Sequence, residues 1–304
     1  MPSWIPTSGA RQYLHYDVFT DTALEGNQLA VFLDGSGLST ERMQAIAQEM
    51  NFSESTFILP SDAPGTDVRM RIFTSHTEMP MAGHPTIGST FALAHSSVIR
   101  PEMTRFVFGL NVGPTPVDLQ WKDGALSFAW MTQLVPEFGP AIQMRAEVAA
   151  AIGLVEADLV PGLPIQRISC GVPFLYVPLR NAETVDRAVS DAAGFRRLKA
   201  ATGIDLPIFL FSWDQTTAYS RMFAPEFGVS EDPATGSASG PLGCYLVHHR
   251  LVAGDAASRI LSLQGVAMGR PSRIHINISE QSGTIAAVKV GGTAVLVGRG
   301  ELVI

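Results

Sequence analysis

The sequence has little cysteine and little charge, and both shortages exclude classes of protein. Its 304 residues include two cysteines, Cys170 and Cys244, too few for a disulfide framework and too few to hold a zinc ion by themselves. Charged residues make up 16% of the chain, against about 25% in typical proteins. The 21 Lys and Arg are outnumbered by 28 Asp and Glu, and they form no basic run. We therefore expect no nucleic-acid partner.

Long apolar runs are missing as well. Gly, Pro, Arg or Asp interrupts each apolar stretch before it reaches the roughly 18 residues that a membrane span needs, although the mean hydropathy is +0.19. The first residues, MPSWIP, lack the basic and apolar segments of a signal peptide. The sequence thus predicts a cytoplasmic protein with no membrane partner.

Apolar residues, in contrast, make up 46% of the chain, and the length favours two domains. Helical periodicity is clearest at Glu41–Met50, behind the caps Ser39 and Thr40, and weaker at Met144–Ile152 and Ala182–Asp191. Because strands and helices do not alternate regularly, we expect an α+β fold with a mostly antiparallel sheet. Strand-like runs of β-branched or alternating residues occur at Tyr13–Thr20, Gln28–Leu33, Ser55–Leu59, Val68–Thr74, Thr104–Leu110, Ala125–Trp130, Val172–Leu179, Pro207–Ser212, Ala218–Phe223, Arg273–Ser279, Thr284–Val290 and Ala294–Val303.

Two segments, Pro85–Val98 and Pro233–Val247, predict helices without a polar face. Each begins with proline, which fits a first helical turn, and then carries small and apolar residues on every side. Such a helix must be buried all round. Its glycines would each cost about 1 kcal/mol in a helix interior, so they indicate close packing of neighbouring backbone. We expect strands to wrap around both helices.

The two segments also resemble each other, which indicates duplicated domains. His84-Pro85-Thr86-Ile87-Gly88-Ser89 aligns with Asp232-Pro233-Ala234-Thr235-Gly236-Ser237 at an offset of 148 (232 − 84), and similar strands that carry Arg71 and Arg221 lie upstream. Coincidence remains the alternative. Prolines and glycines cluster near 111–118, so we expect one domain of residues 1–115 plus 286–304 and a second of residues 116–285.

The starts of these helices are candidate anion sites. Unpaired N–H groups and the helix dipole favour negative charge there, and Gly83-His84 and Gly236-Ser237 supply small residues at both. If the domains face each other, the two helix starts could hold a small carboxylate between the titratable side chains of His84 and Asp232. The alternative is that His84 and Asp232 are only N-caps.

Glu54 is a candidate acid/base. It follows an amphipathic helix and directly precedes an apolar strand, so we expect partial burial at the mouth of that strand. A buried carboxylate has a raised pKa and can exchange a proton near neutrality. A solvated loop glutamate is the alternative.

Several motifs carry a family resemblance, and they occur over nearly the whole chain. They resemble the signatures of the PhzF-like (phenazine biosynthesis) isomerase family. The resemblance implies the diaminopimelate-epimerase-like fold, with two pseudo-symmetric β-barrel domains, each wrapped around a central α-helix, and the active site between them. The motifs are Gly26-Asn27-Gln28-Leu29-Ala30-Val31, Ser53-Glu54-Ser55-Thr56-Phe57, Ala82-Gly83-His84-Pro85-Thr86, Glu231-Asp232-Pro233-Ala234-Thr235-Gly236-Ser237-Ala238 and Gly269-Arg270-Pro271-Ser272.

The resemblance also implies a function and roles for residues. The family archetype moves a proton in trans-2,3-dihydro-3-hydroxyanthranilate without a cofactor, so we expect a cofactor-independent isomerase of a related small carboxylate. Glu54 matches the catalytic acid/base, and His84 and Asp232 would orient the substrate. The substrate-binding set is Gly83, Gly236, Ser237 and Asn27, with the N–H groups near the two glycines holding a carboxylate or oxyanion.

Departures from the family motifs, and the absence of motifs of other enzyme classes, narrow the chemistry that this sequence predicts. Gln28 and Ser55 stand where proline and threonine are usual. Related racemases use two cysteines where this chain has Ala82 and Pro233, so Cys170 and Cys244 are expected to be packing residues. No nucleotide-binding glycine motif, helical metal-ligand pair or nucleophile elbow occurs, so we expect no cofactor and no metal. We also expect a homodimer. A non-catalytic small-anion-binding or interaction protein on the same fold is the alternative function.

Overall fold

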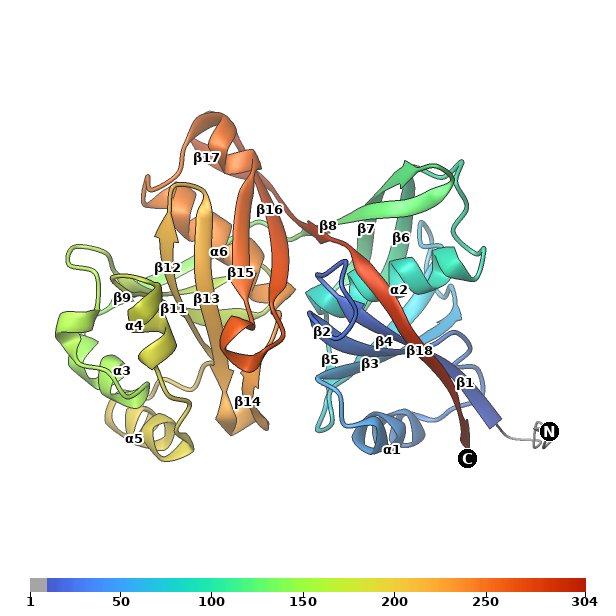
Figure 1. Ribbon diagram of the computed structural model, residues 1–304, viewed down its shortest axis with the longest axis horizontal. Coiled ribbons are helices and arrows are strands. Elements are labelled where there is room, and N and C mark those ends of the chain that lie inside the picture. Colours follow the sequence, from blue (N-terminus) through green and yellow to red (C-terminus); the bar gives the residue numbers. More distant parts are fainter. Residues whose placement is uncertain (1–9) are drawn as a thin grey trace.

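The computed structural model describes residues 10–304, which form two bodies side by side (Figure 1). One 18-stranded sheet runs through both. The first body contains β1 (Ala10–Val18), β2 (Asn27–Phe32), β3 (Glu54–Pro60), β4 (Val68–Phe73), β5 (Glu78–Met79), β6 (Arg105–Leu110), β7 (Gly113–Lys122), β8 (Ala125–Gln133) and β18 (Ala294–Val303). The second contains β9 (Glu137–Ile142), β10 (Ile165–Ser169), β11 (Pro173–Pro178), β12 (Ile208–Asp214), β13 (Thr217–Ala224), β14 (Val229–Asp232), β15 (Ile260–Gln264), β16 (Ser272–Gln281) and β17 (Thr284–Gly292).

Helices lie inside and around these strands. The outer ones are α1 (Thr40–Met50), α3 (Arg145–Ala151), α4 (Ala182–Arg187) and α5 (Ala192–Thr202), and the inner ones are α2 (Gly83–His95) and α6 (Gly236–His248). Short 3₁₀ turns occur at Glu156–Asp158, Pro225–Phe227, Gly254–Ser258 and Val266–Met268. None of the helices within residues 10–304 is long and apolar enough to cross a membrane.

The helix α1 shows how local sequence sets the approach to Glu54. The Ser39 side chain caps its start by accepting from the backbone N–H of Arg42, and Met43 and Ile46 lie on its buried face. The helix ends at Asn51, whose left-handed backbone (φ 51°) turns the chain toward β3. The amphipathic helix predicted at Glu41–Met50 is therefore confirmed.

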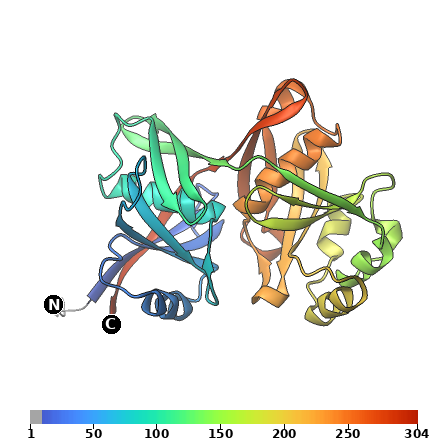
Figure 2. The same ribbon diagram turned by 180° about the vertical axis from the view of Figure 1, so that it is seen from behind.

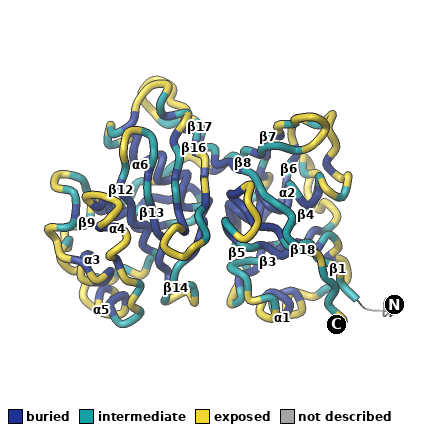
Figure 3. Tube along the Cα trace, viewed as in Figure 1, coloured by how far each residue is buried: buried dark blue, intermediate teal, exposed yellow. Residues whose placement is uncertain are grey.

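The two inner helices are buried on almost every side, as their sequences predicted. Nearly every residue of α2 and α6 is buried, and Figure 3 shows exposed segments on the outer helices α1, α3 and α5 instead. The predicted ends were wrong. α2 begins at Gly83, two residues before Pro85. α6 begins at Gly236, so Pro233 lies before the helix, and the proline that α6 contains is Pro241. A proline this early in α2 costs no hydrogen bond, because the first N–H groups of a helix have no partner within it.

The strand pairings of the first body recur in the second. In the first, β2 is parallel to β3, β3 antiparallel to β4, and β4 antiparallel to β5 and parallel to β6. In the second, the same relations join β11 to β12, β12 to β13, and β13 to β14 and β15. The duplication indicated by the sequence is present in the topology.

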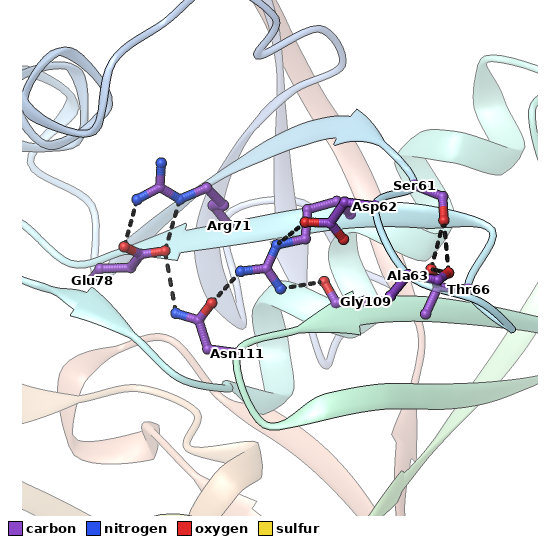
Figure 4. Close-up of polar contacts among 9 residues, drawn as sticks. Ser61, Asp62, Ala63, Thr66, Arg71, Glu78, Gly109 and Asn111 are labelled. Atoms are coloured by element: carbon purple, nitrogen blue, oxygen red, sulfur yellow. Dashed lines mark hydrogen bonds and ion pairs between the residues drawn. The ribbon is translucent and has the colours of Figure 1, made fainter.

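An arginine–glutamate pair also recurs and corrects the sequence alignment. Arg71 donates from Nε and Nη2 to Glu78 at 2.8 and 2.6 Å (Figure 4), and Arg221 does the same to Glu231 at 2.8 and 2.7 Å. The glutamates are 153 residues apart (231 − 78), as are the starts of α2 and α6 (236 − 83). His84 therefore corresponds to Ser237, and its predicted match with Asp232 was an error of register.

Each body has its own apolar core, and strands cross between the bodies. The expected boundary after residue 115 falls inside the β6–β7 hairpin, and Val117 and Met131 pack in the first core. We propose that the first body runs to Gln133, where β8 pairs with β17 (Figure 2). The expected boundary before residue 286 falls inside β17, which gives Val288 to the second core and Val290 to the first. We propose residues 134–136 as the linker.

The C-terminal strand returns to the first body, as we expect from the sequence. β18 pairs antiparallel with β1 along its whole length. Cys170 and Cys244 are both buried in the second core with free thiols, which agrees with packing roles.

Candidate active site

The inner helices α2 and α6 begin against each other between the two bodies. A Cβ atom on Gly83 would lie 2.5 Å from the Cα of Gly236 and 2.8 Å from the backbone N of Ser237. No other residue type at position 83 could approach so closely without displacing backbone. The first N–H groups of both helices, which have no partner within the helix, thus converge with the positive ends of both dipoles.

Glu54 and His84 face each other beside these helix starts. Glu54 is the first residue of β3, where it pairs with Leu29 of β2, and His84 is the second residue of α2. Glu54 Oε2 lies 3.3 Å from His84 Nε2. Their geometry is not that of a hydrogen bond, and both atoms are buried without a hydrogen-bond partner among residues 10–304. Two buried polar atoms in this state can contact a ligand that enters between the helices.

Asn27 connects the residues from the two bodies. As the first residue of β2, it donates from Nδ2 to Asp232 Oδ1 at 2.7 Å and to the backbone O of Ala234 at 3.0 Å. The same nitrogen lies 3.2 Å from His84 Nδ1. Asn27 therefore fixes Asp232 of the second body next to His84 of the first.

Asp232 is hydrogen-bonded on both of its carboxylate oxygens. Its Oδ1 also accepts from Ser53 Oγ at 3.1 Å, and its Oδ2 accepts from Thr235 Oγ1 at 2.6 Å. Glu54 Oε2, in contrast, has no such donor within the described chain. The two carboxylates of the site therefore have different surroundings, which is the usual way to give two acids different tasks.

Burial shifts the protonation of all three titratable groups. Burial, and then the negative charge of Asp232, raises the pKa of Glu54 well above its ordinary value. Burial raises the pKa of Asp232 to about 6, although hydrogen bonds from Thr235, Asn27 and Ser53 oppose the shift. Burial lowers the pKa of His84 to about 3, against a hydrogen bond to the Gln28 backbone. At neutral pH His84 is a neutral imidazole.

The predicted site residues are brought together, and two alternatives are wrong. The N-cap residues of α2 and α6 are Ala82 and Thr235, so His84 and Asp232 are not caps. The side chain of Glu54 is only 16% exposed, so it is not a solvated loop residue. Ser237, the second residue of α6, presents its backbone N beside Gly83.

Sequence reasoning missed four residues that hold the site in shape. Ser53 directly precedes Glu54 in its motif and contacts Asp232, and Thr235 lies in the same motif as Asp232, which it contacts. These positions beside the carboxylates could have identified both residues from the sequence. Arg270 also belongs to a motif but was given no role. Gln264, fully buried at the end of β15, carries no local signal, because its partners lie about thirty residues away in sequence.

Arg270 holds the turn that precedes Asn27. It donates from Nη2 to Asp17 Oδ1 at 2.6 Å and to the backbone O of Glu25 at 2.8 Å, and from Nε to the backbone O of Gly26 at 2.7 Å. Asp17 is 1% exposed and also accepts from the backbone N–H of Leu24 at 2.7 Å. The arginine thus fixes a loop of the first body from the second.

The described part of the chain contains no cluster of metal-ligating side chains. No three His, Cys, Asp or Glu side chains of residues 10–304 are grouped to hold a metal ion. The expectation of chemistry without a metal or organic cofactor stays a prediction.

Comparison with known proteins places this geometry in a family. Residues 16–300 match the model of the PhzC-PhzF family, phenazine biosynthesis-like protein. An uncharacterised isomerase of Mesorhizobium japonicum is 38% identical over 97% of this chain and 99% of its own. The trans-2,3-dihydro-3-hydroxyanthranilate isomerase of Pseudomonas aeruginosa is 35% identical over 95% of this chain and 98% of its own. The crystal structure of a PhzF-family protein of Bacillus anthracis has a TM-score of 0.85 at 29% identity, covering 98% of this chain and 100% of that one.

The chain therefore belongs to the phenazine biosynthesis-like PhzC-PhzF family, and it is an isomerase. Its fold is the diaminopimelate-epimerase-like one that the motifs implied, two β-barrel bodies around central helices.

Proposed function

We propose that this isomerase moves a proton within a small carboxylate substrate, related to dihydro-hydroxyanthranilate, with Glu54 as the acid/base and without a metal or organic cofactor. The observation that carries the proposal is the position of Glu54. Its buried Oε2 has no hydrogen-bond partner in the described chain and lies 3.3 Å from His84 Nε2, where two helix N-termini meet. The name of the Pseudomonas relative supports the substrate class.

The residues of the site have distinct roles in this reaction. Glu54 removes a proton from a substrate carbon and returns it at another, which its raised pKa favours near neutrality. The negative charge that develops on the substrate lies at the N–H groups of Gly83, Gly236 and Ser237, where the helix dipoles stabilise it. His84 is a neutral imidazole, so its Nε2 contacts a polar substrate group without adding a positive charge to the site.

Asp232 and Asn27 hold the substrate and the residues of the site in their relative positions. Asp232 is an acceptor fixed by Asn27, Ser53 and Thr235, so it orients a donor group of the substrate beside Glu54. General acid–base catalysis of this kind contributes about 10²–10⁴ in rate.

A deuterium-exchange screen tests the proposal. The full-length protein, purified with and without a chelator and analysed for metal, flavin and pyridoxal phosphate, is incubated in D₂O with small cyclic and amino-acid carboxylates. We expect mass spectrometry to show deuterium in at least one of them, equally with and without the chelator. Turnover that requires one equivalent of bound metal would contradict the cofactor-free proposal. Binding of carboxylates without any exchange would favour the small-anion-binding protein instead.

A further inference from the structure

Gln264 makes three hydrogen bonds to the segment that joins β14 to α6. Its Oε1 accepts from the backbone N–H of Thr235 at 3.0 Å, and its Nε2 donates to the backbone O of Asp232 at 2.7 Å. The same Nε2 lies 2.9 Å from Thr235 Oγ1. The side chain is fully buried at the end of β15, and its hydrogen bonds go to the Asp232 backbone and to Thr235 rather than to the Asp232 carboxylate.

These contacts determine which way the Gln264 amide points. A backbone N–H can only donate and a backbone carbonyl can only accept, so one orientation of the amide satisfies both. In that orientation Nε2 faces Thr235 Oγ1 with its second hydrogen. The hydroxyl of Thr235 therefore accepts from Gln264.

The hydroxyl hydrogen of Thr235 then has one direction left. Thr235 Oγ1 lies 2.6 Å from Asp232 Oδ2, and a hydroxyl has a single hydrogen to donate. Because Gln264 already donates to the hydroxyl oxygen, the hydroxyl donates to the carboxylate. A directed chain thus runs from Gln264 through Thr235 to Asp232.

We propose that Gln264 is a positioning residue for the proton transfer, which acts on Asp232 through the Thr235 hydroxyl and keeps that carboxylate a hydrogen-bond acceptor while Glu54 exchanges protons. This inference rests on the proposed function. It adds a residue from β15, outside all the motifs of the sequence, to the machinery of the site.

The charged groups around Asp232 show why such a fixed donor matters. The charge of Asp232 acts on Glu54 of β3, and His84 of α2 lies 3.2 Å from the Asn27 nitrogen that donates to Asp232. Glu231 precedes Asp232, with its own carboxylate paired to Arg221. Burial, and less strongly the Glu231 carboxylate, raise the pKa of Asp232, whereas the hydrogen bonds from Thr235, Asn27 and Ser53 oppose this. With Gln264 in place, Thr235 cannot turn its hydrogen away, so Asp232 and Glu54 keep different protonation states.

The test follows the Asp232 carboxyl carbon by NMR titration of the full-length protein. Gln264→Met removes the donors at similar length and should raise the pKa of Asp232 by about one unit, because a hydrogen bond to the charged form is lost or loosened. Thr235→Val should raise it at least as much, and Thr235→Ser should keep the original value. Where a substrate is available, the acid limb of the kcat profile should move with the titration, with little change in KM.

Double variants separate the chain of hydrogen bonds from a general structural effect. In a Thr235→Val background, Gln264→Met should cause no further shift. In a Ser53→Ala background it should keep its full shift, because Ser53 donates to the other oxygen of Asp232. Gln264→Leu is the second variant if Gln264→Met does not fold.

Two results would overturn the proposal. One is a folded Gln264 variant that loses thermal stability but leaves the Asp232 titration in place, and the other is an equal shift with and without the Thr235 hydroxyl. The titration needs no substrate, so it is independent of the proposed function. If the titration behaves as expected but Asp232→Asn exchanges protons at the full rate, the role of Asp232 in the reaction is what fails.

Discussion

Gly83 and Gly236 start the two inner helices in direct contact, with 2.5 Å between the Cα of Gly236 and the position a Cβ would take on Gly83. This contact joins the halves of a duplicated chain at the point where their helix dipoles converge. The site therefore depends on how closely two backbones approach, as well as on its titratable side chains.

Gly83→Ala should disturb that approach. The added methyl group meets backbone rather than a flexible side chain, so we expect a loss of about 1–3 kcal/mol in the free energy of unfolding and weaker binding of carboxylates, measured by urea denaturation and calorimetry. Gly298→Ala is the matched control, because its new Cβ would meet no atom closer than His15 Cβ at 3.9 Å. Equal stability and equal carboxylate affinity of the two variants would show that the close approach of the helix starts is not required.

Asp232→Asn should weaken both ligand binding and turnover. The amide would present an NH₂ group to Thr235 or to Asn27 and Ser53, which are donors to the present carboxylate. An unsatisfied buried polar group costs about 1–3 kcal/mol. Calorimetric titration of a carboxylate ligand, together with exchange rates, checks this. Unchanged affinity would remove Asp232 from substrate orientation.

His84 should make stability depend on pH. Its pKa falls to about 3 in the folded protein from 6.5 in the unfolded chain. Between these values the unfolded chain binds the additional proton, so the His84 contribution to stability rises with pH, by up to about 1.4 kcal/mol per unit. Asp232, whose pKa is raised to about 6, acts in the opposite direction between about pH 4 and 6.

Comparison with a variant isolates the histidine, because Asp232 is present in both proteins. Between pH 4.5 and 6.5, the free energy of unfolding of the wild type should rise relative to that of His84→Gln, as measured by urea denaturation. The exposed His76→Gln serves as the control and should parallel the wild type. Parallel curves for His84→Gln and the wild type would show that His84 is not buried as a neutral imidazole.

Arg270→Met should loosen the turn before Asn27. It leaves the Asp17 carboxylate, 1% exposed, without its cation, and breaking a buried ion pair costs about 3–5 kcal/mol. Arg273→Met is the control, because the Arg273–Glu25 pair is 3.8 Å apart and the arginine is half exposed, where such pairs contribute about 0–1 kcal/mol. Similar denaturation midpoints for the two variants would contradict the role assigned to Arg270.

Local patterns predicted much of this structure, and long-range contacts account for what they missed. Apolar composition identified the inner helices, and the Arg-bearing strands revealed the duplication. The expected break near 111–118 is instead the start of β7. Pro114 and Pro116 lie opposite β6, and the pairing with β8 begins only at Val117. This part of β7 is therefore paired on one side only, where proline is tolerated in a sheet.

The wrong alignment of His84 with Asp232 also came from a local sequence pattern. Glu231 follows Arg221 by ten residues whereas Glu78 follows Arg71 by seven, so the second repeat is three residues longer here. The letters Pro-x-x-Gly-Ser therefore recur at a different point of each repeat. The roles of Gln264 and Arg270 could not be inferred from the sequence, because their partners are distant along the chain. Tertiary packing, rather than any local periodicity, brings them to the site.

The most direct measurement compares Glu54→Gln, Glu49→Gln and the wild type in deuterium exchange on a carboxylate that the wild type turns over. Glu54→Gln keeps the shape of the side chain and removes its basic oxygen, whereas Glu49 is exposed on α1. We expect Glu54→Gln to lose at least about 10² in rate while its carboxylate affinity stays near that of the wild type, and we expect Glu49→Gln to exchange normally. Equal exchange by Glu54→Gln and the wild type would show that Glu54 is not the acid/base of this site.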